Sequence, residues 1–142
     1  MKWTLSSIVC AALALPAFSL GEQDVFIQFG SDVQDVEYDQ ARSRAYVSIP
    51  NQNKVVVLDT NTWLPLNEIS VAPSPRGVAL SLDGARLYVA KFGAGAVAVI
   101  DPDTFAQVEI PLTTELGDAR TWDVIEAQPN RLYVSSNPSS NG

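Results

Sequence analysis

The segment of residues 77–101 reads GVALSLDGARLYVAKFGAGAVAVID, and two further segments of the chain are degraded copies of it. An upstream copy, residues 35–59, reads DVEYDQARSRAYVSIPNQNKVVVLD, and a downstream copy that begins at Asp123 reads DVIEAQPNRLYVSSNPSSNG. The Tyr-Val pairs of the three copies are 42 and 45 residues apart and begin at Tyr46, Tyr88 and Tyr133. A repeat of this length is typical of architectures in which copies of one supersecondary unit stack on each other.

Each copy contains short apolar runs separated by turn residues, and this pattern predicts strands. Residues 54–58 and 96–100 are rich in β-branched side chains, and the Asp83-Gly84 pair between two apolar runs is a strong hairpin signal. The repeats do not show the period of a long amphipathic helix. We therefore expect four strands in each complete unit, with the units at residues 35–71, 77–112 and 123–142, the last of them incomplete.

A four-stranded sheet of this kind cannot bury both of its faces alone and needs a neighbouring sheet on each side. The repeat therefore predicts an all-β fold, a β-propeller, in which each copy forms one antiparallel blade beside a central channel. A β-sandwich is the competing all-β fold, but its strands would not show an internal repeat.

Propellers typically have 4–8 blades, which at this period takes roughly 170–340 residues. The chain has 142 residues, and the third copy stops after its second strand. Two interpretations follow: the chain is the N-terminal portion of a longer protein, or short chains assemble into a ring. We favour the first, because a natural ring-forming chain would end at the boundary of a repeat. In both cases we expect a partial propeller that needs further blades, in cis or by self-association.

The residues of the repeat resemble those of the YVTN family of β-propeller repeats. The shared pattern is an apolar strand, Asp-Gly, Arg-Leu-Tyr-Val-Ala, a glycine-rich turn and a strand that ends in Ile-Asp, and residues 77–104 match it best. Residues 35–62 match it well and residues 123–135 by half. Similar repeats occur in lactonase-like enzymes, surface-layer proteins and propeller domains of periplasmic redox enzymes. The resemblance therefore implies a fold and leaves the function open.

The N-terminal segment, residues 1–19, has the composition of a secretory signal peptide. Lys2 precedes an apolar run at residues 8–15, which is followed by a proline and by small residues at the −3 and −1 positions of a cleavage site. The run is too short to span a bilayer, so we expect no stable membrane insertion. We expect a mature chain of residues 20–142 in an extracytoplasmic compartment, either periplasmic or secreted.

Composition narrows the chemistry that the chain can support. The sequence has no histidine, and its single cysteine, Cys10, lies within the predicted signal peptide. Nucleophilic, metal and haem sites that depend on these residue types cannot be built from the mature segment, so we predict no metal site and assign no cofactor. A formal net charge of −7 makes the chain a poor ligand for nucleic acids.

In a propeller, the loops that precede the innermost strands share one face with the loops between the second and third strands, at the mouth of the channel. The expected loops of the first kind include residues 72–76 and 117–122, which carry Arg76 and Arg120. These arginines can converge on an anionic ligand through bidentate hydrogen bonds, or they can pair with nearby aspartates. Trp122 can stack on a ring of a ligand, or it can pack between blades.

Aspartates complete the set of candidate residues. Asp35 and Asp123 hold equivalent positions in the first and third copies, where the second copy has Gly77. Their carboxylates can contact a ligand or act as a base, or they can cap the turn before the strand. The predicted ligand-binding residues at the channel mouth are Asp35, Arg76, Asp118, Arg120, Trp122 and Asp123.

The most regular residues of the repeat are interpreted as structural, because what a repeat conserves between its copies is usually packing. The tyrosines of the Tyr-Val pairs are expected to pack between blades. An arginine lies two residues before each of these tyrosines, near the face opposite the predicted site: Arg44, Arg86 and Arg131.

The leading functional hypothesis is a non-catalytic scaffold that binds a small-molecule or protein ligand at the channel mouth. One alternative is a propeller enzyme, either a lactonase-like hydrolase or a periplasmic redox enzyme, with its catalytic groups in further blades. Another is a structural repeat protein of the cell surface. Whether the protein is an enzyme stays open, and for this segment the sequence favours a protein that is not one.

Overall fold

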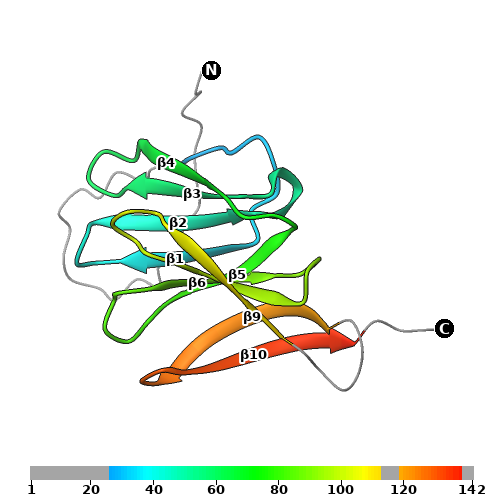
Figure 1. The fold of residues 1–142 in the computed structure, drawn as a ribbon. Coiled ribbons are helices and arrows are strands. Elements are labelled where there is room, and N and C mark those ends of the chain that lie inside the picture. Colours follow the sequence, from blue (N-terminus) through cyan, green and yellow to red (C-terminus); the bar gives the residue numbers. More distant parts are fainter. Residues whose placement is uncertain (1–25, 113–118, 139–142) are drawn as a thin grey trace, which may run out of the picture.

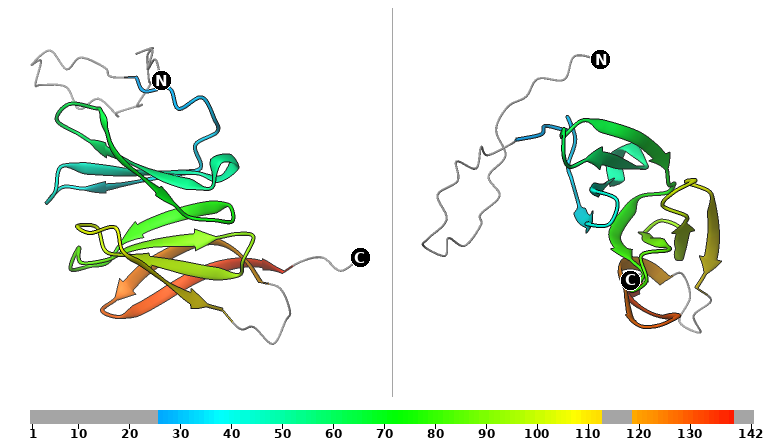
Figure 2. Two further views of the ribbon diagram at one scale, coloured as in Figure 1. Left: turned by 45° about the horizontal axis from the view of Figure 1, so that its top comes forward. Right: turned by 90° about the vertical axis from the view of Figure 1, so that its left-hand side faces the viewer.

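The computed structural model describes residues 26–112 and 119–138, and within them the chain forms three antiparallel sheets and no α-helix (Figure 1). The sheets follow one another in space in the order of the sequence (Figure 1 and Figure 2). Sheet 2, formed by residues 75–111, lies between sheet 1, formed by residues 35–70, and sheet 3, formed by residues 119–138. The predicted signal peptide, residues 1–19, lies outside the described residues. The all-β fold that the repeat predicts is confirmed.

Each complete copy of the repeat forms a four-stranded meander in which consecutive strands pair. Sheet 1 consists of β1 (Asp35–Asp39), β2 (Arg44–Ile49), β3 (Lys54–Asp59) and β4 (Pro65–Ser70), and the short 3-10 helix η1 (Pro50–Gln52) connects β2 to β3. Sheet 2 consists of β5 (Pro75–Leu80), β6 (Leu87–Lys91), β7 (Ala96–Ile100) and β8 (Gln107–Pro111). Within the described residues, sheet 3 consists of β9 (Ala119–Gln128) and β10 (Arg131–Pro138).

The turn between β5 and β6 confirms the hairpin predicted at Asp83-Gly84. Gly84 has a φ of +69°, a conformation that glycine adopts without a steric penalty. Its N–H donates to the carbonyl oxygen of Ser81 at 2.8 Å, and Asp83 Oδ1 accepts the N–H of Ala85 at 3.0 Å. These contacts close the loop and help to set the register of the two strands.

Apolar side chains of sheet 1 and sheet 2 form the main core, because alternate residues of each strand point into the space between the sheets. Tyr46 of β2 lies in this core with Leu87 and Val89 of β6, and all three are fully buried. A second cluster contains Tyr88 of β6 and Val124 of β9 and joins sheet 2 to sheet 3. Each sheet is therefore held in place by the neighbour that the repeat requires.

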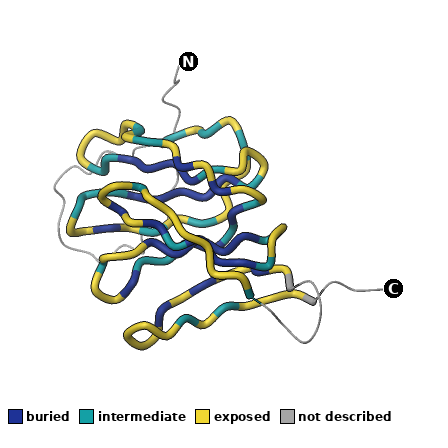
Figure 3. The backbone as a smooth tube through the Cα atoms, viewed as in Figure 1, coloured by how far each residue is buried: buried dark blue, intermediate teal, exposed yellow. Residues whose placement is uncertain are grey.

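The tyrosine of the Tyr-Val pair has the same position in all three sheets. Tyr46 and Tyr88 are 0% and 3% exposed beneath the following sheet, which confirms their predicted role in packing between sheets. Tyr133 and its cross-strand neighbour Ile125 lie on the far face of sheet 3 and are 49% and 57% exposed. Figure 3 accordingly shows β9 and β10 as mostly exposed, in contrast to the buried central strands of sheets 1 and 2, which are β2, β3, β6 and β7.

The segment that precedes β1 covers part of the outer face of sheet 1. Ile27 and Phe29 pack against the apolar cluster that contains Val47. Val36 and Tyr38 of β1 lie on the same face and remain more than half exposed. Sheet 1 therefore presents an apolar strip along its innermost strand.

The predicted boundaries of two loops are wrong. We expect loops at residues 72–76 and 117–122, but β5 and β9 begin within these ranges. The partner strands are long enough to continue the pairing, as in the pair that Asn137 of β10 forms with Arg120. Three predicted site residues that we expect in these loops therefore lie within strands: Arg76, Arg120 and Trp122.

Candidate functional site

Three equivalent positions of the repeat form a row of contacts at the beginning of the innermost strands. Gln34, Arg76 and Trp122 each lie two residues before the first valine of an innermost strand. Arg76 Nη1 donates to Gln34 Oε1 at 3.1 Å, and Arg76 Cζ lies 4.0 Å from the ring centre of Trp122. The row therefore crosses all three sheets with Arg76 at its centre.

Irregular strand pairing places Arg76 and Trp122 in this row. In β5 the register shifts between Pro75 and Val78, and the shift leaves Arg76 outside the regular pairing with β6. In β9 the register shifts next to Trp122, because Asp123 pairs with β10 and the next paired residue is Thr121. Such bulges bend a strand and redirect its side chains, and they are frequent next to functional sites.

Phe92, which directly follows β6, lies at the centre of the side chains around Arg76. Its ring centre is 4.2 Å from Arg76 Cζ and 5.5 Å from Arg120 Cζ. Its ring packs edge to face with Trp122 at a centroid distance of 5.6 Å. We call Arg76, Phe92, Arg120 and Trp122 the cationic–aromatic cluster. The sequence prediction missed Phe92, although its position directly after a second strand places it on the face predicted for the site.

The two guanidinium groups of the cluster lack acidic partners among the described residues. None of the ion pairs in residues 26–112 and 119–138 involves Arg76 or Arg120. The Nε atom of Arg76 is buried, and within the same residues it has no hydrogen-bond partner. The aromatic rings supply cation–π attraction in place of a carboxylate. Two positive charges thus lie close together where the innermost strands begin, in a chain whose net charge is −7.

The predicted site residue Asp35 connects two sheets through backbone hydrogen bonds. Asp35 Oδ1 accepts the N–H of Val36, and Oδ2 accepts the N–H of Val78 in β5, both at 2.8 Å. Glu37 continues this row by accepting the N–H of Leu80 at 3.3 Å. Burial raises the pKa of Glu37, although the hydrogen bond from Leu80 acts in the opposite direction. The bond from Val36 is local, as the capping interpretation of Asp35 expects, whereas the bonds from Val78 and Leu80 join sheet 1 to sheet 2.

Asp123 also accepts a backbone N–H, from Val124 at 2.8 Å, and it packs closely against sheet 2. A Cβ atom added to Gly77 would lie 2.2 Å from Asp123 Oδ1 and 2.7 Å from Asp123 Cα. Gly77 is therefore the residue that allows β9 to approach β5. Of the predicted residues, the structure brings together Arg76, Arg120 and Trp122, gives Asp35 and Asp123 backbone partners, and leaves Asp118 outside the described residues.

The opposite ends of the innermost strands carry a network of ion pairs and hydrogen bonds between sheets. Arg42 forms two hydrogen bonds to Asp103 of sheet 2, from Nε at 2.7 Å and from Nη2 at 2.9 Å. Arg42 Nη1 donates to Asp39 Oδ2 at 3.0 Å and to the carbonyl oxygen of Gly84 at 2.9 Å. The bidentate pair holds the pKa of Asp103 below its ordinary value.

The periodic arginines contribute to the same network. Arg44 Nη1 donates to the carbonyl oxygen of Pro102 in the next sheet, and Arg86 Nη1 donates to Asn130 Oδ1 of the sheet after that, at 3.1 Å. Both bonds connect one sheet to the following sheet. For Arg44 and Arg86 the predicted structural role is therefore confirmed. At this end of the sheets the arginines bond to the neighbouring sheet, whereas the arginines of the cationic–aromatic cluster contact aromatic rings.

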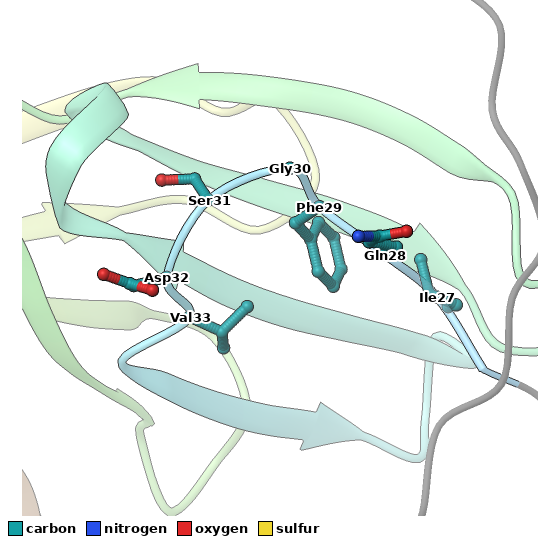
Figure 4. Close-up of a pocket in the computed structure, with 7 residues that line it drawn as sticks. All are labelled: Ile27, Gln28, Phe29, Gly30, Ser31, Asp32 and Val33. Carbon is teal, nitrogen blue, oxygen red and sulfur yellow. The ribbon is translucent and has the colours of Figure 1, made fainter.

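Two cavities lined by described residues lie away from the cluster. A shallow cavity of about 450 Å³ is lined by residues 27–33, which curve over the outer face of sheet 1 (Figure 4). A smaller one, of about 170 Å³, adjoins the ion pair between Lys91 and Glu109. Neither contains a predicted site residue. We therefore assign the first to the packing of the N-terminal segment on sheet 1 and keep the cluster as the candidate site.

The described residues contain no group of three or more histidine, cysteine, aspartate or glutamate side chains that could hold a metal ion. They also contain no helix of the length and apolarity needed to cross a bilayer.

Solved structures of low sequence identity share this fold. A hydrazine synthase from Kuenenia stuttgartiensis matches with a TM-score of 0.61 and 21% identity, over 78% of this chain and 32% of its own. The dihydro-heme d1 dehydrogenase NirN, in complex with DHE, matches with a TM-score of 0.62 and 20% identity, over 78% and 26%. The β-propeller domain of Cps50 (Swd1) from Myceliophteria thermophila matches with a TM-score of 0.62 and 14% identity, over 75% and 33%.

The chain spans about a third or less of the length of these structures. No family model matches the sequence, and no curated protein matches it. At these identities the likeness concerns the fold. The chain has a β-propeller architecture, in which sheets 1, 2 and 3 are consecutive blades.

Proposed function

We propose that this protein is an extracytoplasmic scaffold of YVTN-type blades that binds an anionic ligand through the cationic–aromatic cluster. The ligand is a small molecule or an acidic group of a protein partner. The observation that carries the proposal is the pair of guanidinium groups around Phe92, which have no carboxylate partner among the described residues. An anion placed between such groups forms charge-assisted hydrogen bonds, which are stronger than neutral ones.

The N-terminal sequence and the exposed faces of the sheets support the remaining parts of the proposal. A basic residue, an apolar run and a small-residue cleavage site support export from the cytoplasm. The exposed Tyr133 on sheet 3 and the exposed Tyr38 on sheet 1 support a requirement for further blades, in cis or by self-association. The strand ends that carry the cluster would then surround the mouth of a channel.

Calorimetric titration of the 142-residue chain with acetate tests anion binding directly. Arg120 is exposed, so replacing it with glutamine removes a charge without disturbing a core. We expect Arg120→Gln to weaken acetate binding by roughly tenfold, the effect of losing one charge-assisted hydrogen bond. The matched control is Arg86→Gln at the opposite strand ends, which should leave the affinity unchanged. Absence of acetate binding to the unaltered chain would refute the proposal.

A further inference from the structure

The cationic–aromatic cluster offers an open aromatic surface beside an exposed charge. Trp122 remains 42% exposed, although Arg76 lies 4.0 Å from its ring centre and Phe92 packs against it edge to face. Arg120 belongs to the same cluster and has an exposed side chain. An indole with an open surface and a neighbouring guanidinium can contact two different parts of one ligand.

The contacts of Arg76 hold the indole in a defined position. The guanidinium lies over both aromatic rings, and Gln34 fixes it from the side through the 3.1 Å hydrogen bond. Trp122 is therefore supported by contacts behind the surface that it exposes. A site whose rings are already ordered loses little conformational freedom when a ligand stacks on it.

We propose that the cluster selects a planar aromatic carboxylate. The ring of the ligand stacks on the open surface of Trp122, and its carboxylate accepts hydrogen bonds from the N–H groups of Arg120. This inference rests on the proposed function, because it specifies the class of anion that the same site takes. Offset stacking of two rings contributes more than the burial of their area, so a planar ring gains affinity that a saturated ring of similar size does not.

Three probes of similar size separate the ring from the charge. Benzoate has a planar ring and a carboxylate, cyclohexanecarboxylate has the charge on a saturated ring, and benzamide has the planar ring without the charge. In calorimetric titrations of the 142-residue chain, we expect benzoate to bind at least fivefold more tightly than cyclohexanecarboxylate and at least tenfold more tightly than benzamide.

Variants of Trp122 assign this preference to the indole. Trp122→Leu should reduce the affinity for benzoate to that for cyclohexanecarboxylate, while Trp122→Phe should retain part of the preference. Circular dichroism checks that each variant is folded. If Trp122→Leu does not fold, the phenylalanine variant and the three probes on the unaltered chain decide the matter.

Each outcome of the titrations has a distinct meaning. Equal binding of benzoate and cyclohexanecarboxylate would refute the aromatic preference, although anion binding would stand. Equal binding of benzoate and benzamide, or no binding of any carboxylate, would refute both this inference and the proposed function. A Trp122→Leu chain that folds and keeps the full preference for benzoate would also refute the inference, because the indole would then serve packing between blades only.

Discussion

Arg76 lies among stabilising and destabilising contacts that nearly offset each other. Its guanidinium gains about 0.5–2 kcal/mol from each of the aromatic rings of Phe92 and Trp122. Its buried Nε–H, which has no partner among the described residues, costs about 1–3 kcal/mol. The gains and the cost are of the same order, so the net contribution of the residue to folding is smaller than the sum of its favourable contacts. We infer that its position serves binding more than stability.

Asp103 has the opposite role, because its contacts stabilise the fold and depend on pH. Its pKa is lowered by the bidentate hydrogen bonds from Arg42, so its contribution is present above the unfolded pKa of about 3.9. That contribution is lost as the pH falls through the lower folded pKa. We expect Asp103→Asn to unfold more easily at pH 7 and to lose less stability between pH 5 and pH 3, as measured by urea midpoints.

Arg42→Gln is the matched variant for this prediction, because it removes the donor and leaves the carboxylate. Its acid profile should be as flat as that of Asp103→Asn. A profile as steep as that of the unaltered chain in both variants would mean that another carboxylate dominates the acid sensitivity.

At the scale of the element, the approach of β9 to β5 depends on the missing side chain of Gly77. A Cβ at this position would lie 2.7 Å from the Cα atom of Asp123, and a backbone atom cannot rotate away. We expect Gly77→Ala to lower the free energy of unfolding by about 1–3 kcal/mol, the usual effect of overpacking. Urea unfolding measures the change, and an unaltered midpoint would show that the strands separate without penalty.

Most strands could be predicted from the sequence, because their apolar runs and turns recur at one period. The turn at Asp83-Gly84 and the buried positions of Tyr46 and Tyr88 follow from that pattern. Strand boundaries near the site could not be predicted. The register shifts at Arg76 and Trp122 depend on pairing with β6 and β10, and a single strand's sequence does not encode that pairing.

The candidate site was predictable in part for a related reason. Arg76, Arg120 and Trp122 can be identified from the sequence because they directly precede the predicted innermost strands. Phe92 was missed, because an aromatic residue after a strand looks like ordinary packing until its neighbours from two other strands are known. The backbone partners of Asp35 were equally hidden, since they belong to the next sheet.

At the scale of the whole molecule, the proposed function assigns stability to one end of the innermost strands and binding to the other. One end holds Arg42 and Asp103, which join sheets 1 and 2 through an ion pair. The other end holds the cationic–aromatic cluster, whose positive charges are not matched by acidic groups of the described residues. Such a division would allow the proposed ligand-binding residues to vary while the framework stays intact.

Thermal unfolding and acetate titration of Arg42→Gln and Arg76→Gln, measured side by side, test this division most directly. Arg42→Gln should lower Tm by roughly 5–10 °C, because it removes the charge-assisted hydrogen bonds to Asp39 and Asp103, and should leave the affinity for acetate unchanged. Arg76→Gln should shift Tm by less than about 2 °C and weaken acetate binding by roughly tenfold. The account would be contradicted if Arg76→Gln unfolded at a much lower temperature while it bound acetate as tightly as the unaltered chain.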